Sequence, residues 1–309
     1  MTTRVRPFTR SDRDQLTTLV NAHLSAVTPG ASVSVQGLLS QLERDPGEFI
    51  VDPWVSERVT LVAEQRSRVV AAAHLLRYRD DADVGSTFRG TAEIHWLVCW
   101  TPAPFWPDAA EAGAALMAGC LAQLDRWQVR RCYADGSLPG PGVYGVPEQW
   151  PHILDLYEQS GFSGGRTETV LIAAVDRLVA DLPRPPLALR TTRTLGINGT
   201  RFTAYDDVVA AAPVEVGYLE VDTNLGEAGR FSRGAGWADI GNLQVAESYR
   251  RRGVATWLLG HATDWLALGG IGRLLAYVDP EDGDAERAFY PAVGFDTLTR
   301  TRRMLQQDR

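Results

Sequence analysis

Apolar residues in the C-terminal part of the chain follow two different periods. Segments 201–207, 214–223 and 238–245 are short, rich in β-branched and aromatic residues, and bounded by polar or glycine-containing stretches. This pattern is typical of β-strands. We therefore predict three neighbouring strands, the first two joined through residues 206–213.

Helical spacing begins after Gly253. Residues of one predicted face recur at i, i+3, i+4, i+7, i+8, i+11 and i+12. They are Val254, Trp257, Leu258, His261, Ala262, Trp265 and Leu266. Gly269 and Gly270 are predicted to end this helix. Beyond it the pattern predicts a buried strand at 273–279, a second helix at 284–290 and a last edge strand at 299–305. A meander followed by strand, helix and strand indicates an α+β fold with one parallel crossover.

The chain also repeats itself once. Three short segments recur in the same order in both halves, which favours a duplicated domain. They are VVAAA at 69–73 and 208–212, AEIHWLV at 92–98 and ADIGNLQV at 238–245, and LYEQSGF at 156–162 and FYPAVGF at 289–295.

A proline-rich stretch at 180–190 marks the predicted domain boundary, because three prolines restrict its backbone. We place domain one at 1–180 and domain two at 185–309. Domain two passes almost directly from its first strand into the next, so the helical segment at 12–45 of domain one has no expected counterpart there.

Composition narrows the class of protein. The 309 residues are 45% hydrophobic with a net charge of −7, which argues against a general nucleic-acid binder. No uninterrupted apolar stretch is long enough for a membrane span, and the N-terminus has no apolar signal segment, so we expect a cytoplasmic protein. The cysteines, Cys99, Cys120 and Cys132, lack metal-site or disulfide spacing, so we expect buried reduced thiols and no metal site.

Three arginines, Arg250, Arg251 and Arg252, precede Gly253 at the predicted helix start. The N–H groups at a helix N-terminus lack intrahelical partners and, together with the helix dipole, favour an anion there. Gly253 allows close approach of the backbone, and Ala255 keeps the first turn free of bulk. A merely solvated charge run is the weaker interpretation, because the dipole opposes cations at this end. The stretch therefore predicts a phosphate or pyrophosphate site.

The motif Arg250-x-x-Gly253-x-Ala255, between a strand and an amphipathic helix, resembles the acetyl-CoA pyrophosphate loop, Q/R-x-x-G-x-G/A, of the GCN5-related N-acetyltransferase (GNAT) superfamily. AFYPAVGF, at 288–295, is similar to the Y-x-x-x-G-F segment of that family. The resemblance covers domain two and, more weakly, domain one. It implies two tandem GNAT-like α+β domains, each a mixed, mostly antiparallel twisted sheet flanked by helices, and acetyl-CoA as co-substrate. The implied cofactor-binding residues are Leu243, Gln244, Val245, Arg250, Arg251, Arg252, Gly253, Val254, Ala255 and Thr256.

The resemblance also implies catalytic roles. Tyr290 fits the family's general acid, which meets the departing sulfur, although it could instead be an aromatic residue packed beside Phe289 and Phe295. Asp239 lies where some relatives carry a base, and we expect it on the same strand face as Leu243 and Val245. A surface carboxylate is an equal alternative for Asp239. The reserve bases are Glu220 and Glu247, whereas His261 reads as a core histidine.

Some positions depart from the family pattern. Gly283 stands where many relatives have a pantetheine-contacting asparagine, and Pro291 should shorten or tilt its helix. Domain one keeps Glu93 and Tyr157 at the positions matching Asp239 and Tyr290, but its loop has no arginine and has prolines at 102, 104 and 107. We therefore predict a degenerate domain one without a pyrophosphate loop. Its segment 136–152 is either a wall of the acceptor pocket or a mobile surface loop.

The predicted function is N-acetyl transfer from acetyl-CoA to a primary amine by direct attack through a tetrahedral intermediate. The acceptor is a small-molecule or peptide amine, and no nucleic acid or membrane partner is expected. One alternative is a catalytically idle acyl-CoA-binding or regulatory module. A second is phosphate recognition in an unrelated α+β hydrolase. The sequence does not identify the acceptor amine or the oligomeric state.

Overall fold

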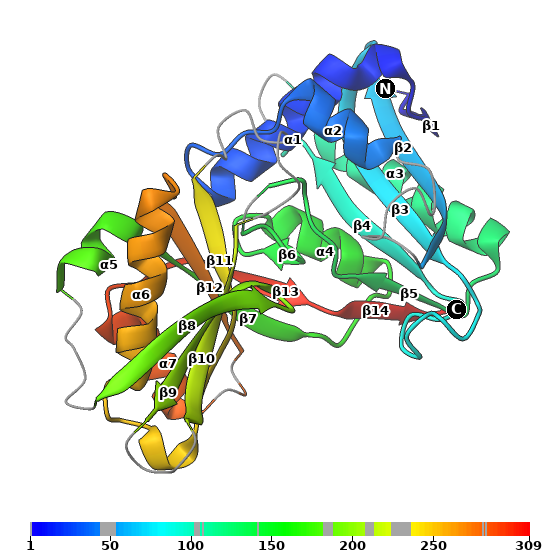
Figure 1. Ribbon diagram of the computed structural model, residues 1–309. Coiled ribbons are helices and arrows are strands. Elements are labelled where there is room, and N and C mark those ends of the chain that lie inside the picture. The colour runs from blue at the N-terminus through cyan, green and yellow to red at the C-terminus, as the bar shows by residue number, and fades with distance from the viewer. Residues whose placement is uncertain are drawn as a thin grey trace. The chain divides into compact units, whose positions relative to one another are not determined.

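The computed structural model divides into two compact units (Figure 1). It describes residues 2–43, 54–101, 106, 108–140, 142–181, 188–207, 213–223, 236–279, 281 and 283–309. Unit one comprises the described residues up to Glu168 together with Thr299–Arg309, and unit two those between Thr169 and Leu298. These limits differ from the predicted domains, 1–180 and 185–309. The prolines of the predicted boundary, like those at 102, 104 and 107, lie outside the described residues.

Unit one is built on a mostly antiparallel sheet in which only β4 and β5 run parallel. In spatial order its strands are β1 (Arg4–Pro7), β2 (Val55–Gln65), β3 (Arg68–Tyr78), β4 (Ala92–Cys99), β5 (Arg131–Ala134) and β14 (Leu305–Asp308). The helices α1 (Arg13–Val27) and α2 (Val35–Leu42) cover one face, and α3 (Ala109–Trp127) covers the other (Figure 1). Helices on both faces explain why β3 is almost continuously buried rather than alternating. In the described part of the chain no helix is long and apolar enough to cross a membrane.

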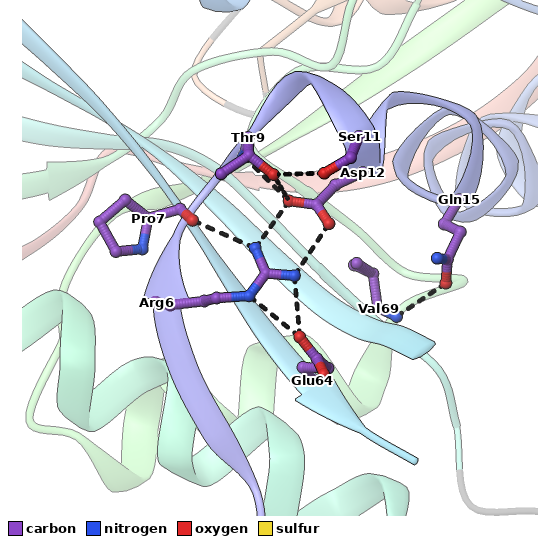
Figure 2. Close-up of polar contacts among 8 residues, drawn as sticks. All are labelled: Arg6, Pro7, Thr9, Ser11, Asp12, Gln15, Glu64 and Val69. Atoms are coloured by element: carbon purple, nitrogen blue, oxygen red, sulfur yellow. Dashed lines mark hydrogen bonds and ion pairs between the residues drawn. The ribbon is translucent and has the colours of Figure 1, made fainter. Parts of the chain in front are cut away.

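An arginine ties the start of unit one together (Figure 2). The guanidinium group of Arg6 on β1 donates to both carboxylate oxygens of Asp12, at 2.7 and 2.8 Å, and to Glu64 on β2. Asp12 in turn accepts from the backbone N–H of Thr9. The planar donor fork of arginine suits such paired carboxylates, so this contact fixes the entry into α1.

The described residues of unit two form one mixed sheet and three helices. In spatial order its strands are β7 (Arg166–Ala174), β12 (Arg273–Val278), β11 (Trp237–Val245), β10 (Val214–Asp222), β9 (Gly199–Asp206) and β8 (Leu189–Gly196). The helices are α5 (Val175–Asp181), α6 (Val254–Leu268) and α7 (Asp284–Ala292). α6 packs on β9, β10 and β11, as the predicted apolar face requires. β8 and β9 are joined by Ile197 and Asn198 alone, so the absence of a counterpart to α1 and α2 at this connection is confirmed.

One strand in the sheet of each unit comes from a distant part of the sequence. β13 (Asp296–Arg303) stops before Met304, whose φ of 57° interrupts the strand, and β14 then pairs antiparallel with β5 in unit one. In unit two the strand that corresponds to β14 is β7, which pairs with β12. β7 follows α4 (Pro151–Gln159) in sequence. The predicted final edge strand at 299–305 is therefore wrong in extent. Either segment can satisfy an unpaired strand edge, so the local sequence does not say which one does.

Arg303 anchors this C-terminal segment in unit one. Its guanidinium group donates to Asp135 at 2.6 and 3.1 Å and to Glu168 at 2.6 Å, and the three side chains are only 10–18% exposed. We expect Arg303→Ala to lower the free energy of unfolding by about 3 kcal/mol, because it leaves two carboxylates without their cation. Arg300→Ala is the matched control, since Arg300 is 60% exposed and lies 3.8 Å from Glu148. Urea unfolding of both variants measures the difference, and equal losses would contradict the assignment.

Two of the three sequence repeats fall on equivalent structure. Ala92 and Glu93 of β4 pair with β5 in parallel register, as Ala238 and Asp239 of β11 pair with β12. The repeats 156–162 and 289–295 both end a helix in a turn that closes on phenylalanine. The third repeat cannot be compared, because 208–212 lies outside the described residues.

Candidate active site

β11 and β12 separate partway along their length. Their parallel pairing ends at Asp239 and Leu275, although β11 continues to Val245 and β12 to Val278. Beyond Asp239, the described pairing of β11 is with β10 alone, so backbone groups on its other edge are available to a ligand. The predicted cofactor strand, Leu243 to Val245, forms this stretch, with Gln244 exposed and its two neighbours half-buried.

A β-bulge interrupts β11 just after Asp239. Ile240 pairs with Val221 and Asn242 pairs with Glu220, so Gly241 is an extra residue with no partner of its own. A bulge of this kind reverses the alternation of side chains along the strand that carries it.

The bulge moves Asp239 to the other face of the sheet. Asp239 pairs with Asp222, and Leu243 pairs with Leu219. Because residues three apart on β10 point to opposite faces, Asp239 lies on the face opposite Leu243 and Val245. The expectation of a common face for these three residues is wrong. Leu243 and Val245 pack against the core under α6, and Asp239 lies on the opposite face of the sheet.

Asp239 is buried in an environment that favours its protonated form. Its exposed fraction is 8%, and the Tyr277 hydroxyl donates to its Oδ2 at 3.4 Å. Burial, followed by repulsion from Asp222, raises the pKa of Asp239 to about 7, against the opposing effect of the Tyr277 hydrogen bond. The surface-carboxylate alternative is therefore wrong. A carboxyl group of this kind is a candidate proton acceptor near neutral pH.

The reserve bases occupy different environments. Glu220 is 1% exposed and accepts from the Asn198 backbone N–H and side chain at 3.3 and 3.1 Å and from Arg201 at 3.5 Å. These contacts occupy the carboxylate in holding the β8–β9 turn. Glu247 is exposed in η2 (Glu247–Tyr249), a short 3-10 turn after β11.

The loop that follows β11 presents an open helix N-terminus. The first helical hydrogen bond of α6 runs from the Trp257 N–H to the Gly253 carbonyl oxygen, at 2.9 Å. The N–H groups just before Trp257 therefore have no helical acceptor. Gly253 is the N-cap residue at φ 81°, a left-handed conformation that favours glycine.

The three arginines differ in their contacts. The Nε of Arg250 donates to the Val245 carbonyl oxygen at 3.2 Å, which fixes the loop to the end of β11. Arg252 lies over the ring of Tyr249, at 5.7 Å from its centroid. Arg251 has φ 57°. All three are exposed, and within the described residues none forms an ion pair with a carboxylate.

Tyr290 is packed in the core of unit two. It is 3% exposed, and its ring meets Phe295 edge-on at 5.3 Å. Tyr157 of unit one is 2% exposed and meets Phe162 in the same way at 5.1 Å. In both repeats the phenylalanine N–H donates to the tyrosine carbonyl oxygen at 3.0 Å. The motif therefore has a structural role in both units. His261, predicted to lie in the core, is half-buried and packs edge-on against Trp257.

The equivalent carboxylate of unit one, Glu93, has a different environment. Tyr78 donates to it, and its Oε1 lies 3.6 Å from His95 Nδ1. Burial alone would raise the pKa of Glu93, but His95 and Tyr78 outweigh that effect and the pKa lies below its ordinary value. Equivalent positions in the two units thus have opposite protonation preferences.

Unit one fills the space between its own separated strands. β4 and β5 part after Glu93, and the segment after β5 buries four side chains in the unit-one core: Leu138, Val143, Val146 and Trp150. The remaining cavity, between β4 and this segment, measures about 10 Å³, room for one water molecule. The expectation of a mobile surface loop at 136–152 is wrong.

Two histidines close the end of the same space. Ring nitrogens of His23 and His152 lie 3.0 and 3.1 Å from the carbonyl oxygen of Cys99, the residue that matches Val245. All three cysteines are free and buried, as predicted, and burial raises the pKa of Cys99 and Cys120 to about 12. Among the described residues no group of three or more His, Cys, Asp or Glu side chains is placed to hold a metal ion.

Comparison with known proteins agrees with this arrangement. Residues 181–295 match the family model described as acetyltransferase (GNAT) family. This part of the chain is therefore similar to the GNAT acetyltransferases. Comparison with functionally curated proteins finds no match.

Solved structures extend the similarity to the whole chain. A tandem GNAT protein from the clavulanic acid biosynthesis pathway is 18% identical with a TM-score of 0.60, over 99% of this chain and 97% of that one. A GCN5-related N-acetyltransferase from Sphaerobacter thermophilus is 15% identical with a TM-score of 0.61, over 99% and 95%. The fold is thus that of tandem GNAT proteins, α+β with mixed sheets flanked by helices. An unrelated hydrolase fold is excluded.

Sequence reasoning missed three features of the site. Tyr277 and Asp222 reach Asp239 from neighbouring strands, and no local pattern marks such cross-strand pairs. The sequence did indicate the bulge, because an isolated glycine within a strand pattern, here Gly241, often marks one. Unit one has His95 at the same position and the same register shift, so glycine is not required for the bulge.

Proposed function

We propose that unit two transfers an acetyl group from acetyl-CoA to a primary amine. The observation that carries this proposal is the open N-terminus of α6, which begins at Gly253 where β11 ends after parting from β12. Helix N-termini with unpaired N–H groups favour phosphate anions. The family match over 181–295 supports acyl transfer as the chemistry.

The site residues divide into a cofactor side and an acceptor side. Backbone N–H groups from Arg251 to Thr256 bind the pyrophosphate, and Arg250, Arg251 and Arg252 supply positive charge beside it. The backbone of Leu243, Gln244 and Val245 pairs with the pantetheine arm and stabilises the oxyanion. The acceptor approaches from the other face of β11, where Asp239 lies.

The proposed chemistry begins with proton removal. Asp239, ionised above about pH 7, accepts a proton from the ammonium group directly or through water. The free amine nitrogen attacks the thioester carbonyl carbon and forms a tetrahedral intermediate. Collapse of that intermediate breaks the C–S bond, and the leaving thiolate takes a proton from Tyr290. The attacking nitrogen, now part of an amide, releases its second proton, and solvent returns a proton to Tyr290. Because a thiol titrates near 8.5 and a phenol near 10, Tyr290 acts as much by hydrogen bonding as by proton transfer.

We infer that each chain binds one acetyl-CoA. The corresponding space in unit one holds its own side chains, including Trp150, and retains about 10 Å³. Titration of the full chain with acetyl-CoA by calorimetry should give one equivalent. Two equivalents would contradict a degenerate unit one.

Turnover with a panel of amines tests the proposed function. Thiol release from acetyl-CoA should depend on an added amine, and the product should gain the mass of one acetyl group. Tight binding of acetyl-CoA without thiol release for any amine would instead support the acyl-CoA-binding module. The burial of Tyr290, which is 3% exposed, is the observation that favours this second candidate function.

A further inference from the structure

We propose that Asp239, Asp222 and Tyr277 act as one unit, in which the tyrosine hydroxyl orients the carboxyl group of Asp239 and the neighbouring Asp222 makes that group a stronger proton acceptor. Asp222 and Tyr277 are then positioning residues for the base. The inference rests on the proposed function of unit two. It adds two residues that no sequence motif marks.

Three adjacent strands bring these residues to one face of the sheet. Asp222 on β10 is the direct cross-strand partner of Asp239 on β11. Tyr277 on β12 donates to Asp239 Oδ2 at 3.4 Å, just where β11 and β12 begin to part. Directly paired residues lie about 4.5–5.5 Å apart at Cβ, so the two carboxyl groups interact.

The bulge at Gly241 is what makes the arrangement possible. Without the extra residue, regular alternation would set Asp239 on the same face as Leu243 and Val245. With it, Asp239 shares a face with Asp222 and Tyr277 while the following residues of β11 point into the core under α6. The acceptor-side base and the cofactor-side backbone thereby occupy opposite sides of one strand.

Asp222 and Tyr277 have opposing effects on the pKa of Asp239, which burial raises most. On the same face of β10, Glu220 is held by Asn198 and Arg201, and Glu215 is also paired with Arg201. Among the described residues, the side chains of β7 and β12 packed on this face are Val170, Ile172 and Leu275, with Trp237 on β11 itself. Arg273, the partner of Trp237 on β12, is an exposed cation on the same face. A nearby like charge disfavours ionisation and a hydrogen bond to the carboxylate favours it, so Asp222 and Tyr277 act in opposite directions.

Unit one provides an internal comparison. Its equivalent carboxylate, Glu93, pairs with Leu76, where Asp239 pairs with Asp222. The position matching Tyr277 is Asp135, which is bound to Arg303. The unit whose cofactor space is filled therefore has neither residue at the matching positions, and the tyrosine that donates to Glu93, Tyr78, lies on β3 instead.

The pH dependence of kcat/KM in two variants tests the proposal. Asp222→Asn should move the acidic limb to lower pH, and Tyr277→Phe should move it to higher pH, each by on the order of one unit. Asp222→Glu, which restores the charge, should return the limb toward its original position. Asp264→Asn, an equal charge change at an exposed position on α6, should leave it in place.

The proposal would be overturned if the acidic limb moved in the same direction in both variants, or if the rates fell and the limb did not move. If the unmodified protein acetylates no amine, the proposed function fails, but the inference can still be tested. The carboxyl carbon of Asp239 is then titrated directly by ¹³C NMR in the two variants. Opposite displacements support the three-residue unit, and unchanged titration overturns it. Unchanged affinity for acetyl-CoA shows that the fold is intact.

Discussion

Replacing Asp239 with asparagine is expected to lower kcat by about 10²- to 10⁴-fold, the usual contribution of a general base. The affinity for acetyl-CoA should stay unchanged, because Asp239 lies on the face of β11 opposite Leu243 and Val245. Steady-state rates with the best amine of the panel, together with calorimetry, measure the two effects separately. A loss of affinity equal to the loss of rate would contradict the placement of Asp239 and the cofactor-binding residues on opposite faces of β11.

Stability provides an independent check on the same variant. Since burial raises the pKa of Asp239 to about 7, the folded state favours the protonated form. The contribution of this group to folding is complete below its unfolded pKa of about 4 and is lost as pH rises through 7. Asp239→Asn should therefore match the unmodified protein below about pH 4 and be more stable above pH 7. Glu220→Gln, which disturbs Asn198 and Arg201, should not show this pattern.

Replacing Gly253 with glutamate should weaken acetyl-CoA binding by about 100-fold or more. A carboxylate at the N-terminus of α6 competes with the pyrophosphate for the same N–H groups. Loss of one or two charge-assisted hydrogen bonds, at about 1.5–3 kcal/mol each, accounts for this magnitude. Calorimetric titration gives the dissociation constant directly.

Backbone strain is the competing explanation for such a loss, and Gly270→Glu controls for it. Gly270 also has a left-handed conformation, at φ 73° compared with 81° for Gly253, and it lies at the opposite end of α6. A side chain added there meets no atom within 4 Å. The two variants should lose similar stability, but only Gly253→Glu should lose binding. Equal loss of binding in both would assign the effect to strain.

Elements with a clear local period could be predicted from the sequence. The strand ending at Val245, the helix from Val254 and the strand from Arg273 all lie where the pattern indicates. The short connection between β8 and β9 also follows from the sequence, since Gly196 and Gly199 flank a two-residue turn. The spacing from Arg250 to Ala255 likewise located the helix N-terminus.

Properties that depend on pairing between distant segments could not be predicted. Nothing local shows that β14 rather than β7 completes the sheet of unit one, since the sequence of a strand does not specify which distant strand it pairs with. The face of Asp239 depends on one extra residue at Gly241, because a single-residue shift reverses every later side chain. The space between β4 and β5 is filled by Trp150 and its neighbours. No hydrophobic periodicity in the sequence indicates that these side chains are buried.

A crystal structure of the protein with CoA bound tests the central claim most directly. We expect one CoA per chain, with its pyrophosphate at the N–H groups of Gly253 to Thr256 and its sulfur where β11 parts from β12. The space between β4 and β5 should remain filled by residues 136–150. CoA bound between β4 and β5, or a pyrophosphate held away from the N-terminus of α6, would contradict it.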